Sequence, residues 1–215
     1  MPRERKTMRD LVLRDVVEIG LGYGLIIFVI WLPTRAQQIL SPVVLVITIA
    51  IVVARCPSRE ELGFGLRGLI PSLWILPAAA ILGAVGVLIA RRLGTLHPLF
   101  HPDVQHVAGY VLWTIYQQVL INDYFQPRFT RLFDSDGPAA IATTVLFSAA
   151  HLPNLWLTVA TLAWGSVSCV LFRRYHNLYA LGLAQGVLGL CFAVCVPDSL
   201  VHHMRVGLGY LRYRQ

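Results

Sequence analysis

Charged residues are scarce in this sequence. They make up 13 % of the 215 residues, whereas hydrophobic residues make up 56 %. A soluble domain usually carries about 25 % charged residues, so a water-covered surface around one core is excluded. The mean hydropathy of +0.64 is typical of a chain with several long apolar segments. The composition therefore predicts an integral membrane protein that crosses the bilayer several times.

The first residues do not have the pattern expected of a cleavable signal sequence, and the cysteines do not have a zinc-type pattern. The first residues, MPRERKTMRDLVLRD, have mixed charge and are not followed by an apolar segment with a small-residue cleavage site in the usual register. The four cysteines, Cys56, Cys169, Cys191 and Cys195, form no CxxC pair. We interpret them as small apolar packing residues.

The apolar runs predict an all-α fold, a polytopic transmembrane helical bundle. A membrane-spanning helix needs about 20 apolar residues. Seven segments approach this length: 16–33, 39–54, 69–90, 107–126, 138–152, 155–172 and 177–197. Residues 1–15 then form a basic N-terminal segment, and residues 16–197 form the membrane domain. The tail, residues 198–215, is either an interfacial helix or an eighth crossing, which gives seven to eight membrane helices.

The cations predict the orientation of the chain. The net charge is +7, but Lys and Arg lie in short loops between apolar runs, so nucleic acid is not an expected partner. With seven crossings and a cytoplasmic N-terminus, twelve of the 18 cations lie inside and six outside. Cytoplasmic loops carry the excess of Lys and Arg, so this orientation is favoured.

The segment 107–126 holds polar residues that a membrane helix does not need. Gln117 and Gln118 are neighbours, followed by Asn122 and Asp123. Neighbouring residues point about 100° apart, so at most one glutamine is expected to face any one partner helix. Gln118 and Asn122 are four apart and share a helix face. Hydrogen bonding between helices, worth about 0.6 to 2 kcal/mol per contact, is one explanation of these residues.

Two later segments carry further polar groups. In LFSAAHLPN, residues 146–154, Phe147 and His151 are four apart, so the ring and the imidazole share a face. His151 either interacts with the last carbonyls of its helix or belongs to a functional site. In the segment 173–190, Gln185 is the polar residue deep in an apolar helix with a glycine face, typical of a close helix contact.

The loop LHPLFHPDVQH, residues 96–106, contains residue types that bind metals. These residues are His97, His101, Asp103 and His106. Two prolines make a single helical face unfavourable, so we expect a solvated interfacial loop, with metal binding as the alternative.

The order of these motifs resembles that of the CPBP intramembrane protease family. This family includes the CAAX-processing endopeptidases and bacteriocin-immunity proteins. The resemblance covers about residues 55–195. The family's second motif, Phe-x3-His, is matched by Phe147 and His151. The resemblance implies a helical membrane fold, an intramembrane site and location in a bacterial cytoplasmic membrane.

The other two motifs of the family are altered here. Its first, Glu-Glu-x3-Arg, falls on Gln117, Gln118 and Asn122, and its third, His-x3-Asn/Asp, falls on Gln185 and Gly189. A glutamate can act as a general base, but a glutamine amide cannot do so near neutral pH. Of the acids elsewhere in the sequence, Asp123 and Glu18 are candidates to orient His151 only if folding brings them near it.

The sequence leaves three functions open. The first is a non-proteolytic relative that binds a lipidated peptide, a lipid or a membrane partner. The second is an active, divergent hydrolase that uses His151, and the third is an unrelated transport or assembly protein. The resemblance gives the site residues, with no metal and no identified cofactor. The candidate catalytic positions are His151, Gln118, Gln117 and Gln185. The supporting cavity positions are Phe147, Asn122, Asn154 and Gly189.

Overall fold

Every regular element in the described part of the chain is a helix. The computed structural model describes residues 2–55, 58–100 and 103–213. The elements, in chain order, are α1 (Pro2–Ile30), α2 (Thr34–Arg55), α3 (Leu69–Ser72), α4 (Ile75–Leu93), α5 (Val104–Val119), η1 (Leu120–Phe125), α6 (Gln126–Phe133), α7 (Asp136–Ala149), α8 (Leu155–Tyr175), α9 (Leu178–Cys195), α10 (Asp198–Val201) and α11 (Gly207–Leu211). The predicted all-α class is confirmed.

Four helical stretches of the described residues are long and apolar enough to cross a membrane. They are Thr34–Arg55, Leu69–Leu93, Leu155–Tyr175 and Leu178–Cys195. Each of the seven predicted segments contains a helix, but these helices differ in length. For example, α7 has 14 residues. At 1.5 Å per residue it is about 21 Å long, whereas the hydrocarbon core is about 30 Å thick.

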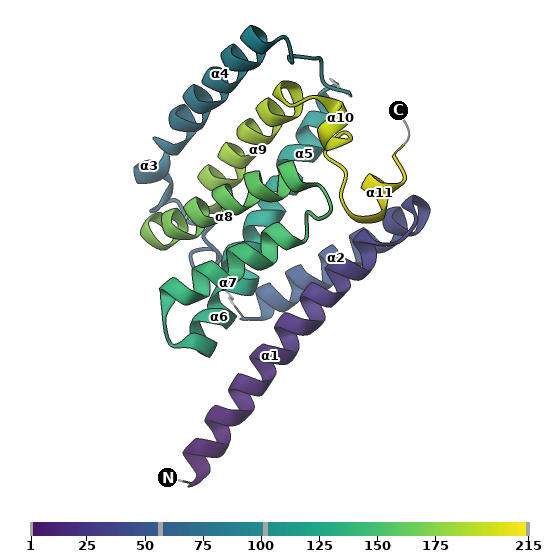
Figure 1. The fold of residues 1–215 in the computed structure, drawn as a ribbon. Coiled ribbons are helices and arrows are strands. Elements are labelled where there is room, and N and C mark those ends of the chain that lie inside the picture. The colour runs from purple at the N-terminus through teal and green to yellow at the C-terminus, as the bar shows by residue number, and fades with distance from the viewer. Residues whose placement is uncertain (1, 56–57, 101–102, 214–215) are drawn as a thin grey trace.

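Helix α9 is the central packing element of the bundle. It lies between α4 and α5, while α7 packs between α6 and α8 (Figure 1). Glycines permit the close contacts of α9. A Cβ atom on Gly182 would lie 2.8 Å from the backbone Cα of Ile115 in α5, and a Cβ on Gly83 in α4 would lie 2.6 Å from Cys191 Sγ. The predicted small-residue face of α9 is therefore a helix–helix contact.

Asparagine and aspartate side chains start three of the helices. Asp103, Asn154 and Asn177 each accept a hydrogen bond from the backbone N–H three residues later, at the N-termini of α5, α8 and α9. Such caps satisfy N–H groups that have no partner within the helix. The short interhelical connections are thereby fixed by local sequence.

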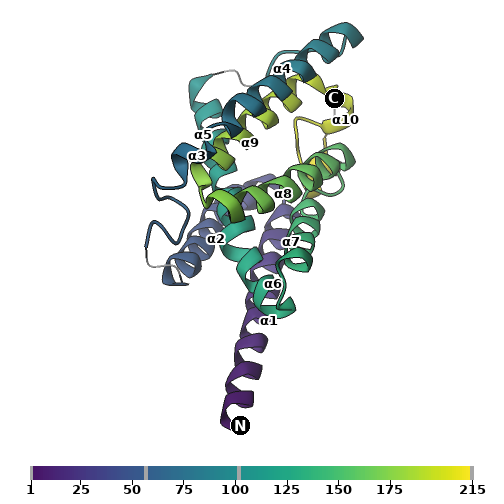
Figure 2. The same ribbon diagram turned by 90° about the vertical axis from the view of Figure 1, so that its left-hand side faces the viewer.

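The two ends of the chain differ from the sequence prediction. Helix α1 does not begin near residue 16 but runs unbroken from Pro2, and its N-terminal half projects beyond the bundle (Figure 2). The tail forms α10 and α11, of four and five residues. Neither can cross a bilayer, so the eighth crossing proposed from the sequence is not formed by the described tail residues.

Candidate functional site

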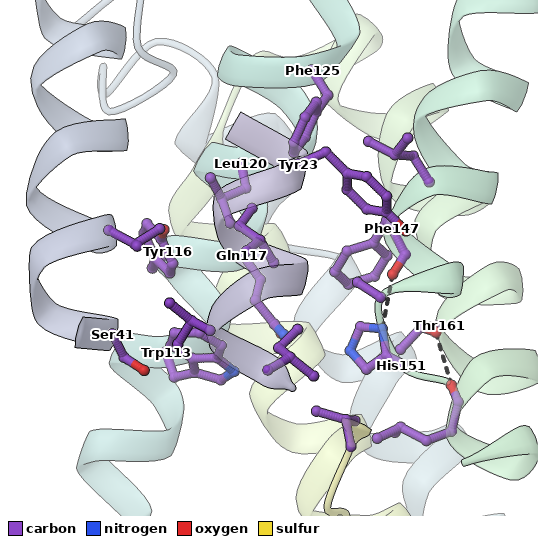
Figure 3. Close-up of a pocket in the computed structure, with 18 of the residues that line it drawn as sticks. Tyr23, Ser41, Trp113, Tyr116, Gln117, Leu120, Phe125, Phe147, His151 and Thr161 are labelled. Carbon is purple, nitrogen blue, oxygen red and sulfur yellow. Dashed lines mark hydrogen bonds between the residues drawn. The ribbon is translucent and has the colours of Figure 1, made fainter. Parts of the chain in front are cut away.

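Three of the four predicted catalytic positions line one cavity. Gln117 of α5, His151 just after α7 and Gln185 of α9 all border a cavity of about 220 Å³. Figure 3 shows Gln117 and His151 pointing into it. These residues lie on α5, on α9 and just beyond the end of α7, up to 68 positions apart, so only the tertiary fold brings them together.

A chain of four side-chain amides crosses the site. Asn122 Nδ2 donates to Gln118 Oε1 at 2.9 Å, Gln118 Nε2 donates to Gln185 Oε1 at 2.5 Å, and Gln185 Nε2 donates to Gln117 Oε1 at 2.5 Å. Trp164 Nε1 of α8 also donates to Gln185 Oε1, at 3.1 Å. The chain runs in one direction and carries no charge. It leaves the NH₂ group of Gln117 at the end that borders the cavity.

The amide chain confirms one sequence prediction and corrects another. The shared face of Gln118 and Asn122 is confirmed by their hydrogen bond. The expectation that only one glutamine faces a given partner helix is wrong, because Gln117 and Gln118 both bond to Gln185. The long side chain of Gln185 presents an acceptor to one glutamine and a donor to the other. Gln185 can therefore bond to both glutamines although their side chains leave α5 about 100° apart.

The helix that carries the two glutamines continues into a π-helical turn. Residues 120–125 form η1 between α5 and α6, without a break. Such turns are rare and occur frequently at functional sites. All six residues of η1 are buried. Asp123 lies within it, and its Oδ2 has no hydrogen-bond partner among the described residues.

His151 is held by a backbone carbonyl and not by a carboxylate. Its Nδ1 lies 2.8 Å from the carbonyl oxygen of Phe147, and the two rings pack edge to face at a centroid distance of 4.9 Å. A carbonyl only accepts, so Nδ1 carries the proton and, in the neutral ring, Nε2 keeps its lone pair. No hydrogen bond joins His151 to Asp123 or Glu18 among the described contacts.

The remaining predicted positions support the fold around the cavity. Phe147 lines the cavity beside His151. Asn154 is fully buried; besides capping α8, its Nδ2 donates to the carbonyls of Val201 at 2.9 Å and Arg205 at 3.1 Å. It therefore anchors the C-terminal tail. Gly189 packs against Tyr110 of α5.

Several residues of the cavity wall were not predicted from the sequence. The end of α1 contributes Tyr23, Ile26, Val29 and Ile30, and the tail contributes Met204 and Val206. Aromatic residues of α5 also line it. Tyr110, Trp113 and Gln117 are spaced by three and four residues, and this helical spacing was the signal available in the sequence.

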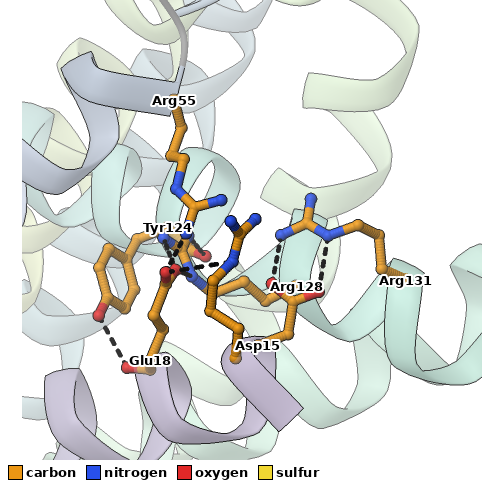
Figure 4. A network of polar contacts seen from close by, with 7 residues as sticks. Asp15, Glu18, Arg55, Tyr124, Arg128 and Arg131 are labelled. Atoms are coloured by element: carbon orange, nitrogen blue, oxygen red, sulfur yellow. Dashed lines mark hydrogen bonds and ion pairs between the residues drawn. The ribbon is translucent and has the colours of Figure 1, made fainter. Parts of the chain in front are cut away.

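Glu18 belongs to a separate, partly buried ion network (Figure 4). Its carboxylate accepts from Arg128 Nε at 2.8 Å and pairs with Arg128 Nη2 at 2.7 Å, and it also contacts Arg55. Nearby, Asp15 receives two hydrogen bonds of 2.7 Å from Arg131. These contacts join α1 to α2 and α6. The candidate partnership between Glu18 and His151 is thus not what the fold produces.

The described residues contain no group of three or more His, Cys, Asp or Glu side chains arranged to hold a metal ion. In the histidine loop, His97 Nε2 lies 2.8 Å from the carbonyl of Val196, and His106 pairs with Asp103 at 2.7 Å. His101 lies outside the described residues. The two described histidines of this loop, His97 and His106, therefore bond to the protein itself.

Comparison with known proteins identifies the family. Residues 42–191, more than two thirds of the chain, match the profile of the Type II CAAX prenyl endopeptidase Rce1-like family. No curated protein and no solved structure matches the chain. The match agrees with the resemblance found in the motifs and removes the interpretation that their order is coincidental. The chain belongs to the Type II CAAX prenyl endopeptidase Rce1-like family, whose members are membrane proteins.

Proposed function

We propose that this protein is a non-proteolytic member of its family that binds a membrane-embedded ligand with an apolar chain. The observation that carries the proposal is the uncharged amide chain formed by Gln117, Gln118, Gln185 and Asn122. These residues occupy the positions where the family's first and third motifs place acids, a histidine and an arginine. Each amide in the chain is bonded to another amide.

Peptide hydrolysis requires groups that the amide chain does not offer. Water must lose a proton to a base as it attacks the carbonyl, and the developing oxyanion must be stabilised. Amides have no basic lone pair near neutral pH. The carboxylate of Glu18 is bonded to Arg128 and Arg55 and has no bond to the amide chain among the described contacts. Amides still form hydrogen bonds, so the site is suited to binding.

The cavity is suited to part of a hydrophobic chain. Its walls are mainly apolar, and His151, Gln117 and Gln185 add polar groups. Pockets for drug-sized ligands usually measure about 300–1,000 Å³. At about 220 Å³ this cavity holds a segment of a ligand, with the rest outside. A prenyl or acyl chain on a lipid or peptide meets this description.

The cellular membrane and the orientation of the protein within it are also proposed. It is an integral membrane protein, and we propose a bacterial cytoplasmic membrane with the N-terminus in the cytoplasm and seven crossings. The cation distribution supports this orientation. A lipid or a lipidated peptide would then reach the cavity from within the bilayer.

The experiment compares cleavage with binding. Purified wild type and the variant Gln117→Glu, Gln118→Glu, Asn122→Arg, Gln185→His are offered fluorescent farnesylated and unlipidated peptides. Wild type is expected to bind the farnesylated peptide in preference and to leave it intact. Cleavage by the variant would strengthen the proposal, since the fold would then lack only the acids and bases. Cleavage by wild type that requires Gln118 would contradict it.

A second candidate function is supported by the orientation of His151. Its Nδ1 proton is bonded to a backbone carbonyl, so the basic Nε2 is directed away from that bond, and the residue lines the cavity. An imidazole in this tautomer can act as a general base. A divergent hydrolase using His151 would lose turnover in His151→Ala and keep it in Tyr116→Phe. Turnover that survives His151→Ala would rule out this assignment.

A further inference from the structure

Tyr110 occupies the space beside Gly189 of α9. A Cβ atom on Gly189 would lie only 1.9 Å from the Tyr110 hydroxyl oxygen and 2.9 Å from its Cζ. Even one additional carbon at this position would therefore displace the tyrosine. In the motif comparison, Gly189 stands where the family has an asparagine or aspartate. The hydroxyl of Tyr110 thus supplies a polar group to a place where the backbone of α9 offers no side chain.

The hydroxyl of Tyr110 is free to bind a ligand. It has no hydrogen-bond partner among the described residues, and the residue lines the cavity together with Gln117, His151 and Gln185. The NH₂ group of Gln117 and Nε2 of His151 likewise have no described partner. A phenol, an amide NH₂ and an imidazole nitrogen with unused hydrogen-bonding capacity therefore belong to residues that line the same cavity.

A second cavity adjoins the first at Tyr110. It measures about 450 Å³ and is more polar in composition, with His97, His106, Asp198 and His203 among its lining residues. Tyr110 and Met204 line both cavities. Tyr110 thus stands between an apolar chamber and a chamber with titratable side chains. A ligand that extends from one chamber to the other must pass its side chain.

We propose that Tyr110 binds the polar end of the ligand and so selects amphiphiles, in which a hydroxyl or carbonyl adjoins an apolar chain. The chain lies in the smaller cavity, against Tyr23 and Phe147, and the polar group accepts or donates a hydrogen bond at the Tyr110 hydroxyl. A pure hydrocarbon chain fills the same space without that bond. This inference rests on the proposed function, since it names the class of ligand bound in the same cavity.

The experiment uses two probes of similar shape, farnesol and its saturated hydrocarbon counterpart farnesane. Binding to the full-length protein in detergent micelles is measured by competition with a fluorescent farnesylated peptide. Tyr110→Phe keeps the ring against Gly189 and removes only the hydroxyl. Its affinity for farnesol is expected to fall about three- to ten-fold, as for the loss of one hydrogen bond, while its affinity for farnesane stays unchanged.

Tyr116→Phe is the matched control. Tyr116 lines the same cavity, but its hydroxyl is already bonded to Thr48 Oγ1 at 2.9 Å. Its removal is expected to leave the ratio of the two affinities unchanged. If Tyr110→Phe also leaves that ratio unchanged while wild type binds both probes, the inference is overturned and the proposed function stands. If wild type binds neither probe, the proposed function fails, and the inference fails with it.

Discussion

The ion pair between Glu18 and Arg128 gives the sharpest prediction about stability. The Arg128 side chain is 2 % exposed and that of Glu18 is 17 % exposed, and two of the guanidinium nitrogens lie within 2.8 Å of the carboxylate. Removing one partner of a buried pair leaves an uncompensated charge, which costs about 3–5 kcal/mol. Arg128 also lies over the ring of Tyr124, 4.0 Å from its centroid, and this contact remains. We therefore expect Glu18→Leu to lower the free energy of unfolding by about 3 kcal/mol, the lower end of that range.

A double variant separates the charge from the packing. In Glu18→Leu with Arg128→Met, no buried charge is left unpaired, because the side chain of Arg55, the other partner of Glu18, is 31 % exposed. The unfolding free energy is therefore expected to lie within about 1 kcal/mol of wild type or above it. Asp136→Ala is the matched control. Asp136 pairs with Arg173 at 2.6 Å, but both side chains are nearly half exposed. An exposed pair contributes about 0–1 kcal/mol.

The assay is reversible unfolding in mixed micelles with increasing sodium dodecyl sulfate, followed by circular dichroism. The expected order of stability is wild type, Asp136→Ala and the double variant close together, with Glu18→Leu well below them. If Glu18→Leu costs no more than Asp136→Ala, the charge of Arg128 is solvated after the change. The view that ion pairs fix α1 to the bundle would then be refuted.

Three further predictions concern single positions. Gln185→Leu removes three hydrogen bonds, and at about 0.6 kcal/mol each in a membrane protein the same assay should show a loss of about 2 kcal/mol. Gly189→Ala should destabilise the protein, because its Cβ collides with Tyr110, and adding Tyr110→Ala should recover part of the loss. The Arg131 hydrogen bond holds the pKa of Asp15 below its ordinary value of 3.8, so the stabilisation is complete above that pH and is lost as the pH falls through the lowered pKa. Unfolding free energy should therefore fall more steeply below about pH 4 in wild type than in Asp15→Asn.

The fold class was predictable because it depends on local hydrophobicity. Every apolar run of sufficient length contains a helix, and the predicted 155–172 and 177–197 correspond to α8 and α9. The ends of helices were less predictable. Polar residues do not stop a helix by themselves, so α1 extends through the charged N-terminal sequence to Pro2. The π-helical turn at 120–125 depends on packing around it, which no local pattern encodes.

The site was predictable where it depends on sequence spacing. Gln118 and Asn122 are four residues apart, as are Phe147 and His151, and the two residues of each pair are in contact. The bond of both glutamines to Gln185 was not predictable, because it depends on the distance between α5 and α9. That distance is set by glycines such as Gly182, which bring the two backbones close together.

Charge is distributed in this protein in a way that suits a binding cavity. The fold does contain buried charged residues: Arg128 and Asp15 are both almost fully buried. They are neutralised as ion pairs at α1, on groups that do not line the cavity. The polar residues that do line it include the neutral amides Gln117 and Gln185. An apolar chain that enters such a cavity does not strip water from a charge, so its binding is opposed by the desolvation of neutral polar groups, and the amides among them already bond to one another.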